Sequence, residues 1–272
     1  MTVLQAFLLG IIQGLTEFIP VSSTAHLLIG QKLLGIPASP ATFSFLVIVQ
    51  LGTVFALILF FWPDIWQINK AFFRGIRHGK PFESHDAMLG WHVIIATIPA
   101  LIAGFLLKDT VETMFKEPVF QAGIRLLMTA VLLTLVEYIG RRNRNLESAT
   151  WQDALTVGFF QIIALFPGAS RSGSTIAGGM VRGFDRPSAA RFAFLMSGPI
   201  LLAAGAYEML DVLKMPNLGE FLPLLAVGFV TAAIVGWFAI KWLIDYLSKR
   251  SLYVFVIYCA VVGALCITSL AL

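Results

Sequence analysis

Apolar residues gather in long, nearly continuous stretches along this chain of 272 residues. A helix needs about 20 mostly apolar residues to cross a hydrocarbon core of about 30 Å. Inside a bilayer, such a helix satisfies all of its own backbone hydrogen bonds, so stretches of this length predict spanning helices. Six stretches come near this length and are predicted to span a membrane: 42–61, 90–107, 119–138, 192–212, 221–240 and 252–271.

Two further apolar regions, 3–30 and 152–181, are interrupted in the middle by polar residues and proline. Continuous spanning helices do not contain such runs. Irregular backbone at membrane depth is tolerated only where protein or a watery cavity satisfies its polar groups. We therefore predict two re-entrant helical hairpins whose turns line a cavity. The interruptions are Glu17-Phe-Ile-Pro-Val-Ser-Ser-Thr-Ala-His26 and Phe166-Pro-Gly-Ala-Ser-Arg-Ser-Gly-Ser-Thr175.

The distribution of lysine and arginine predicts how the spans are oriented. Connecting regions rich in these residues belong in the cytoplasm. Four regions carry 13 of the 19 Lys and Arg residues: 62–89, 139–150, 182–191 and 241–251. Three regions carry only 4 and are predicted to lie outside: 20–41, 108–118 and 213–220. The net charge of +4 is therefore a topology signal, and we expect no nucleic-acid partner.

An internal repeat relates the two interrupted regions. Residues 11–18 and 22–24 align with residues 159–166 and 170–172 at a constant offset of 148, although chance similarity between apolar helices is the alternative. Each half, about 1–140 and 150–272, would hold one hairpin and three spans, and an odd number of spans inverts the second half. The predicted fold is therefore an all-α integral membrane protein. It has six transmembrane helices plus two re-entrant hairpins in an inverted-topology repeat, forming one membrane domain over residues 1–272.

The first interruption combines a carboxylate, hydroxyls and an imidazole. Gln13 and Glu17 are spaced i, i+4 and share a helix face, directly before Pro20-Val-Ser22-Ser23-Thr24-Ala-His26. An ionisable residue within a membrane is costly, which makes it a functional-site hypothesis. The alternative is that Glu17 only caps the hydroxyl-rich turn.

The second interruption, Gly168-Ala-Ser-Arg-Ser-Gly-Ser-Thr175, has the spacing of a nucleotide-binding P-loop, but Ser174 stands where that loop has lysine. The physics of anion binding still applies. Glycines let backbone N–H groups approach an anion, a helix beginning near Thr175 directs its positive end there, and Arg171 offers a planar fork for phosphate oxygens. The alternative is close helix packing by the small residues, with Arg171 reaching the membrane surface.

Together the two motifs resemble those of the bacterial undecaprenyl pyrophosphate phosphatase family, also called bacitracin resistance proteins. Gln13 to His26 is similar to the family's (E/Q)xxxE motif with its Ser-Ser-Thr-x-His continuation, and Pro167 to Thr175 is similar to PGxSRSxxT. The resemblance covers essentially the whole chain. It implies hydrolysis of undecaprenyl pyrophosphate to undecaprenyl phosphate and inorganic phosphate, which recycles the lipid carrier for cell-wall synthesis. It also implies a divalent cation, Mg²⁺ or Ca²⁺, and a multi-pass protein of the bacterial plasma membrane whose site faces outward.

The resemblance also implies which residues act. Gln13 stands where many relatives have Glu. A glutamine can neither act as a base nor carry charge for a metal. A mechanism that needs two carboxylates would therefore lack one of them in this chain. The catalytic set would be Glu17, Ser23, His26 and Arg171, with Glu17 also a metal ligand. The diphosphate would be lined by Gln13, Ser22, Thr24, Gly168, Ser170, Ser172, Ser174 and Thr175.

Chemistry leaves two questions open. Ser23 could be the nucleophile with Glu17 or His26 as base, which we favour, or His26 could itself attack and form a phosphohistidine. The second question is function, because a transporter or flippase for a phosphorylated prenyl lipid or small anion also uses inverted repeats with broken helices. Such a protein would need Arg171 but not the set around Ser23. The expected partners are undecaprenyl pyrophosphate and membrane lipids, and a homodimer is left open.

Overall fold

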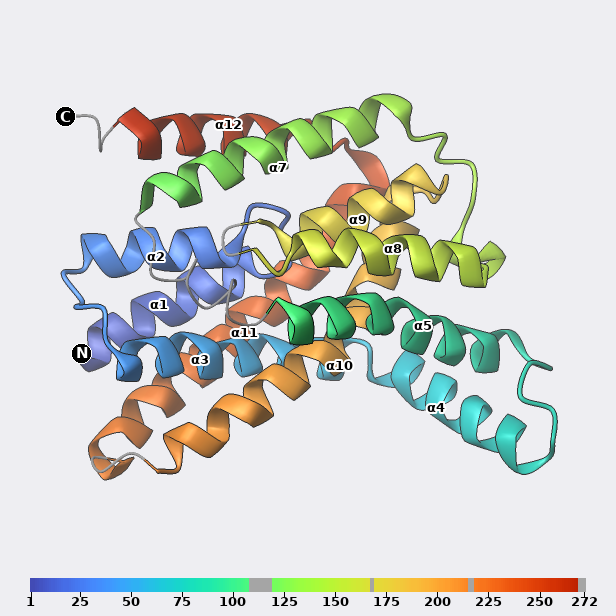
Figure 1. Ribbon diagram of the computed structural model, residues 1–272, viewed down its shortest axis with the longest axis horizontal. Coiled ribbons are helices and arrows are strands. Elements are labelled where there is room, and N and C mark those ends of the chain that lie inside the picture. Colours follow the sequence, from blue (N-terminus) through green and yellow to red (C-terminus); the bar gives the residue numbers. More distant parts are fainter. Residues whose placement is uncertain (108–118, 167–168, 215–217, 269–272) are drawn as a thin grey trace.

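The computed structural model describes residues 1–107, 119–166, 169–214 and 218–268. In this part of the chain all regular elements are helices, and the single β-bridge joins Arg144 to Phe184. The all-α prediction is therefore confirmed. The helices (Figure 1) are α1 (Val3–Thr16), α2 (Ser23–Leu33), α3 (Pro40–Phe60), α4 (Trp62–Arg77), α5 (His85–Leu106), α7 (Val119–Ile139), α8 (Trp151–Ile163), α9 (Arg171–Val181), α10 (Arg186–Val212), α11 (Leu218–Lys249) and α12 (Tyr253–Thr268), with a 3-10 turn η1 (Leu146–Ser148).

Five helices are long and apolar enough to cross a bilayer, namely α3, α5, α7, α10 and α11. They coincide with five of the six predicted spans. The sixth prediction, 252–271, falls on α12, which has 16 residues within the described part of the chain, while residues 269–272 lie outside it. With several helices of spanning length, the chain is a multi-pass membrane protein.

The predicted connecting region 62–89 contains a helix, α4, that the sequence pattern missed. Its inner face places Phe72 against Trp91 of α5, with ring centroids 4.9 Å apart. Trp66 and Phe73 belong to the same apolar side but are exposed, and basic residues occupy its last turn. An amphipathic helix has apolar residues on one side only. Polar residues therefore interrupt the sequence of α4, and a search for long apolar stretches does not detect this helix.

The two predicted hairpins are α1–α2 and α8–α9, and the chain builds them with the same local devices. Thr2 and Thr150 each begin the first helix with a capping box, in which the cap hydroxyl and a side chain three residues later exchange bonds with the backbone. Ser22 and Ser170 cap the second helices. Both pairs are separated by 148 residues, the offset of the repeat. Figure 1 shows the hairpins entering from opposite ends of the molecule, with their turns meeting at its centre.

Each hairpin packs against a helix of the other half through a glycine. A Cβ atom on Gly10 of α1 would lie 2.8 Å from the Gly228 carbonyl oxygen of α11. A Cβ atom on Gly158 of α8 would lie 2.6 Å from the Ala96 carbonyl oxygen of α5. Gly10 and Gly158 are again 148 residues apart. In a membrane, such small residues let helix backbones approach closely, and here they hold both hairpins deep in the protein.

A buried carboxylate joins several loops at one end of the molecule. Glu137, near the end of α7, accepts hydrogen bonds from Arg142 at 2.8 Å, from Arg186, and from the backbone N–H of Leu252 at 3.2 Å. Such a buried charge is tolerated because it is paired and hydrogen-bonded. The connections after α7, before α10 and before α12 therefore lie together.

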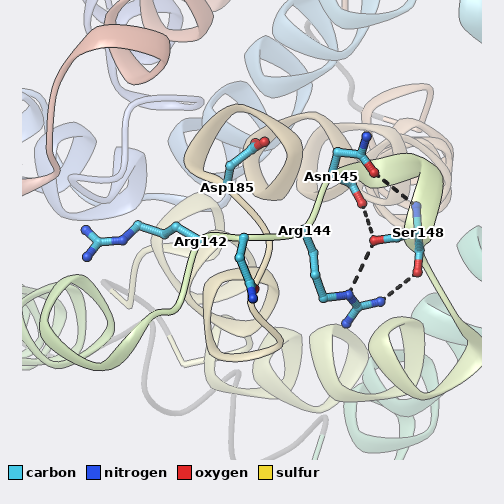
Figure 2. Close-up of a pocket in the computed structure, with 6 residues that line it drawn as sticks. Arg142, Arg144, Asn145, Ser148 and Asp185 are labelled. Atoms are coloured by element: carbon cyan, nitrogen blue, oxygen red, sulfur yellow. Dashed lines mark hydrogen bonds between the residues drawn. The ribbon is translucent and has the colours of Figure 1, made fainter.

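Arg144 fixes the loop between the two halves. Its guanidinium donates to both carboxylate oxygens of Asp153, at 3.0 and 2.7 Å, and to the Ser148 carbonyl at 2.6 Å. Arg182, at the end of α9, donates to Asp153 at 2.6 Å. Figure 2 shows Arg144 pointing toward Ser148 and away from Arg142 in a pocket lined by this loop. None of the lining residues is a predicted site residue, so the pocket belongs to the connection between the halves.

Replacement of Gly158 by alanine is expected to lower the free energy of unfolding by about 1–3 kcal/mol, because the added methyl group overlaps the Ala96 carbonyl. Gly219→Ala is the control, because a Cβ atom there meets no atom within 4 Å. Thermal unfolding of the purified protein in detergent measures both variants. Equal melting temperatures for Gly158→Ala and wild type would contradict the close approach.

Asp153 makes stability depend on pH. Burial disfavours its charge, but hydrogen bonds from Arg144 and Arg182 outweigh burial and hold the pKa of the carboxyl well below its usual range. Ionised Asp153 therefore stabilises the fold above the unfolded pKa of about 3.9, and this contribution is lost as the pH falls toward the lower folded pKa.

Asp153→Asn is expected to cost roughly 3 kcal/mol at pH 7, because two arginines lose a buried carboxylate partner. From pH 5 to pH 3, the melting temperature of the wild type should fall more steeply than that of the variant. Parallel curves would show that the folded and unfolded states bind protons at residue 153 equally.

Candidate active site

The turns of the two hairpins meet through an ion pair between Glu17 and Arg171. Glu17 ends α1, and Arg171 is the first residue of α9. Glu17 is only 4% exposed, and 19% of the Arg171 side chain is exposed. The two residues lie 154 positions apart in the chain. The structure thus brings the two polar motifs into one site, and Arg171 points to Glu17 rather than to the membrane surface.

Four side chains donate hydrogen bonds to the Glu17 carboxylate. Oε1 accepts from Arg171 and, at 3.3 Å, from Gln50 Nε2. Oε2 accepts from Gln13 Nε2 and from Ser23 Oγ, each at 2.7 Å. Charge-assisted hydrogen bonds of this kind offset the cost of removing a carboxylate from water. Both oxygens of the buried carboxylate are therefore hydrogen-bonded, and one of the donors is a serine hydroxyl.

Helix geometry explains why these groups converge. Gln13 and Glu17 are one turn apart on α1, and Gln13 is almost completely buried. Ser22 has a positive φ of 67°, which reverses the chain, and its hydroxyl caps α2 by accepting from the Ala25 N–H at 3.3 Å. Ser22 rather than Glu17 therefore caps the turn. This leaves Ser23, the first residue of α2, beside the carboxylate.

His26 lies one turn after Ser22 on α2 and is held at both ring nitrogens. Nδ1 lies 2.8 Å from the Ser22 carbonyl oxygen, and Nε2 lies 2.7 Å from the hydroxyl of Tyr258 on α12. A carbonyl oxygen only accepts, so Nδ1 carries a proton. The structure places His26 at the edge of the same turn as Ser23, but its ring does not contact Glu17 or Arg171 among the interactions of the described residues.

The second motif begins α9 in a way that parallels α2. Ser170 caps this helix by accepting from the Gly173 N–H at 3.0 Å. Ser172 joins the two hairpins, because its hydroxyl donates to the Ile19 carbonyl at 3.2 Å and lies 3.4 Å from the Ser170 hydroxyl. The N-terminal end of a helix attracts anions. Here that end points into the turn that contains Arg171.

The remaining predicted diphosphate ligands are less directly placed. Thr175 donates its hydroxyl hydrogen bond to the Arg171 carbonyl at 2.9 Å, and Ser174 is buried within α9. Thr24 is partly exposed beside Ser23. Gly168 lies outside the described residues, so the predicted role of its backbone stays a prediction. Ser174 and Thr175 thus support the helix that carries Arg171.

Three residues of the site were missed by sequence reasoning. Gln50 and Thr53 lie on α3, where Gln50 binds Glu17 and Thr53 lies 3.4 Å from Gln13 Nε2. Tyr258 lies on α12 and binds His26. All three are polar residues within predicted apolar spans, and that is the signal that could have indicated them.

Gln13, which contacts Glu17, offers one unpaired oxygen ligand to a divalent cation. Within the described residues no group of three or more His, Cys, Asp or Glu side chains could hold a metal. However, Gln13 Oε1 is buried and has no hydrogen-bond partner, while Gln13 Nε2 binds Glu17. Mg²⁺ is commonly bound by one or two protein oxygen ligands together with substrate phosphates and water. The residues present fit a cation that binds together with a phosphorylated substrate.

Comparison with known proteins identifies the family. The chain matches the family described as "Bacitracin resistance protein BacA" over residues 6–265. It is 40% identical to an undecaprenyl-diphosphatase of Chloroherpeton thalassium, covering 100% of this chain and 98% of the relative. It is 42% identical to undecaprenyl-diphosphatases of Chlorobium phaeovibrioides and Anaeromyxobacter dehalogenans, covering 97% of this chain and 96% and 90% of those relatives. The chain therefore belongs to the bacitracin resistance protein BacA family.

Proposed function

We propose that the protein hydrolyses undecaprenyl diphosphate to undecaprenyl phosphate and inorganic phosphate, thereby recycling the lipid carrier for cell-wall synthesis. The relatives at about 40% identity are named for this activity. The observation that carries the proposal is the hydrogen bond of 2.7 Å from the Ser23 hydroxyl to Glu17, beside Arg171. A hydroxyl, a base and a fixed cation in contact are what phosphoryl transfer to a side chain needs.

In the proposed reaction Ser23 Oγ attacks the terminal phosphorus while its proton passes to Glu17 Oε2. The bond between that phosphorus and the bridging oxygen breaks, and the lipid monophosphate leaves with this oxygen. Water then attacks the phosphoserine and passes a proton to His26 Nε2. The bond between phosphorus and Ser23 Oγ breaks, Glu17 returns its proton to Ser23 Oγ, and inorganic phosphate leaves. A guanidinium has five N–H donors, so Arg171 can hold Glu17 through Nη2 and bind phosphate oxygens through the others.

Two observations favour Ser23 over His26 as the nucleophile. Ser23 is hydrogen-bonded to a carboxylate that can accept its proton. The one nitrogen of His26 without an obligatory proton, Nε2, is bound to Tyr258. In this proposal Ser23 attacks, and His26 accepts a proton through the Nε2 lone pair at the edge of the site.

A divalent cation, Mg²⁺ or Ca²⁺, is proposed to bind with the substrate, held by Glu17 and Gln13. The unpaired Oε1 of Gln13 supports this proposal, because an amide oxygen is a suitable ligand for a hard cation although it carries no charge. When bound, the cation would neutralise charge on the phosphate oxygens. This role would suit a glutamine at position 13 without requiring a second carboxylate.

We also propose the finer topology, in which six spans and two re-entrant hairpins form an inverted repeat in the bacterial plasma membrane. The contacts of Glu137 support it, because they join two of the regions predicted to be cytoplasmic, 139–150 and 182–191, to the start of α12. Arg191 pairs with Asp64, which brings the region 62–89 to the same end. With that end in the cytoplasm, the site would open to the outer side. A homodimer stays an expectation.

A transporter or flippase is the second function that the motifs admitted. It would need an anion site such as Arg171 but would have no use for a serine hydroxyl hydrogen-bonded to a carboxylate. The names of the relatives also favour the phosphatase. The contact between Ser23 and Glu17 and the names of the relatives therefore both support the phosphatase.

Loss of the reacting groups is expected to lower the rate of phosphate release from undecaprenyl diphosphate by about 10³-fold or more in Ser23→Ala, Glu17→Gln and Arg171→Lys. The measurement is inorganic phosphate produced by purified protein in detergent with Mg²⁺. Ser248→Ala is the matched control, because this exposed serine binds only a backbone carbonyl among the described residues. Release by Ser23→Ala at the wild-type rate would exclude Ser23 as the nucleophile.

Removal of divalent cations by a chelator is expected to abolish phosphate release, and added Mg²⁺ should restore it. Gln13→Ala should raise the Mg²⁺ concentration needed for half-maximal rate, and Gln13→Glu should lower it, because a carboxylate binds the cation more tightly than an amide. Gln161→Ala is the control, since Gln161 is the buried residue at the same place in the other hairpin. An unchanged Mg²⁺ requirement in both Gln13 variants would remove Gln13 from the cation site.

A further inference from the structure

Tyr258 reaches the first motif from the last helix of the chain. Its hydroxyl lies 2.7 Å from His26 Nε2, across 232 residues of sequence. The two rings are stacked, with centroids 5.5 Å apart and planes inclined by 13°. A hydrogen bond and a stacked face on the same ring determine both its position and its rotation.

The contacts on the other side of the ring determine its protonation. Nδ1 lies 2.8 Å from the Ser22 carbonyl oxygen, which can only accept a hydrogen bond. In the neutral imidazole the proton is therefore on Nδ1, and Nε2 has the lone pair. The Tyr258 hydroxyl then donates to Nε2. One imidazole nitrogen is thus tied to the turn of the first hairpin and the other to α12.

A neighbouring contact shows that α12 is docked against this turn. The Cys259 thiol lies 3.8 Å from the Pro20 carbonyl oxygen, within the distance expected of a weak sulfur hydrogen bond. Cys259 is completely buried, whereas Tyr258 is 43% exposed and His26 is partly exposed. Tyr258 is therefore anchored by its buried neighbour while its own ring stays at the accessible edge of the site.

We propose that Tyr258 is a positioning residue for His26, holding the imidazole ring so that the Nε2 lone pair is directed to the edge of the site. This inference rests on the proposed phosphatase function. Nε2 is the nitrogen that can accept a proton from the attacking water, so its direction decides whether His26 can act. The Tyr258 hydroxyl hydrogen-bonds Nε2, and its stacked ring keeps the imidazole from turning. The second half of the chain thereby contributes, besides Arg171, the group that orients an imidazole of the first half.

The test separates the hydroxyl of Tyr258 from its ring. Tyr258→Phe keeps the stacked face and removes the hydrogen bond, and it is expected to lower kcat about 10-fold, the rate equivalent of one hydrogen bond, with KM changed less than twofold. Tyr253→Phe is the matched control, because Tyr253 is an exposed tyrosine on the same helix. Phosphate release from undecaprenyl diphosphate is the measurement, with thermal unfolding as the check on folding.

A double-mutant cycle tests whether Tyr258 acts through His26. In a His26→Ala background, Tyr258→Phe should cause no further loss, because the group that it positions is gone. A full 10-fold loss in that background would overturn the proposal, and so would wild-type kcat in Tyr258→Phe alone. The conservative variant thus gives a clear result even where Tyr258→Ala fails to fold.

Nitrogen-15 NMR of histidine-labelled protein tests the contact independently of activity. The His26 signals, assigned by their loss in His26→Ala, should show the Nδ1-protonated tautomer in both proteins, because the Ser22 carbonyl remains, but the Nε2 chemical shift should change in Tyr258→Phe as the hydrogen bond to this nitrogen is lost. The same spectrum in both proteins would overturn the proposal. If wild-type protein released no phosphate while the spectra behaved as expected, the proposed phosphatase function would fail and the positioning contact would stand.

Discussion

The ion pair of Glu17 and Arg171 is the interaction on which the site depends. Either charge alone would cost several kcal/mol in the interior of a membrane protein, and together they offset much of that cost. The pair also fixes the turns of two hairpins against each other. Ser23 and Gln13 can then donate to the same carboxylate, and the helix that begins at Arg171 directs its positive end into the turn. The same ion pair therefore holds the two hairpins together and positions the groups of the site.

That contact needs both hairpins to reach the middle of the protein. Each does so because a glycine, Gly10 or Gly158, lets its first helix touch the backbone of a helix in the other half. At the loop end, Glu137 and Asp153 bind arginines from several connections, so charges also hold the outer ends of the helices. The second hairpin is thus held by close packing along α8 and by the ion pairs of Asp153 at its outer end.

Sequence reasoning succeeded where the signal was local. Proline, glycine and charge inside apolar stretches indicated both hairpins, and the cost of an ionisable residue within a membrane marked Glu17 as a functional-site candidate. It failed where the partner was distant in sequence. Gln50 and Tyr258 are single polar residues in apolar spans, and only the packing of α3 and α12 shows what they touch. The helix α4 was missed because its apolar residues follow one face instead of a continuous run.

The two hairpins share their scaffold and differ in their chemistry. At the offset of 148, caps match caps and glycine matches glycine, yet Leu165 stands opposite Glu17 and Arg171 opposite Ser23. Two copies of the first hairpin would bury two like carboxylates, and two copies of the second would bury two guanidinium groups. A pair of identical hairpins would therefore leave its buried charges without a partner of opposite sign. The two halves therefore depend on each other for charge neutralisation, because Glu17 of the first half pairs with Arg171 of the second. Divergence of the two repeats at these positions is what lets one buried site carry both charges.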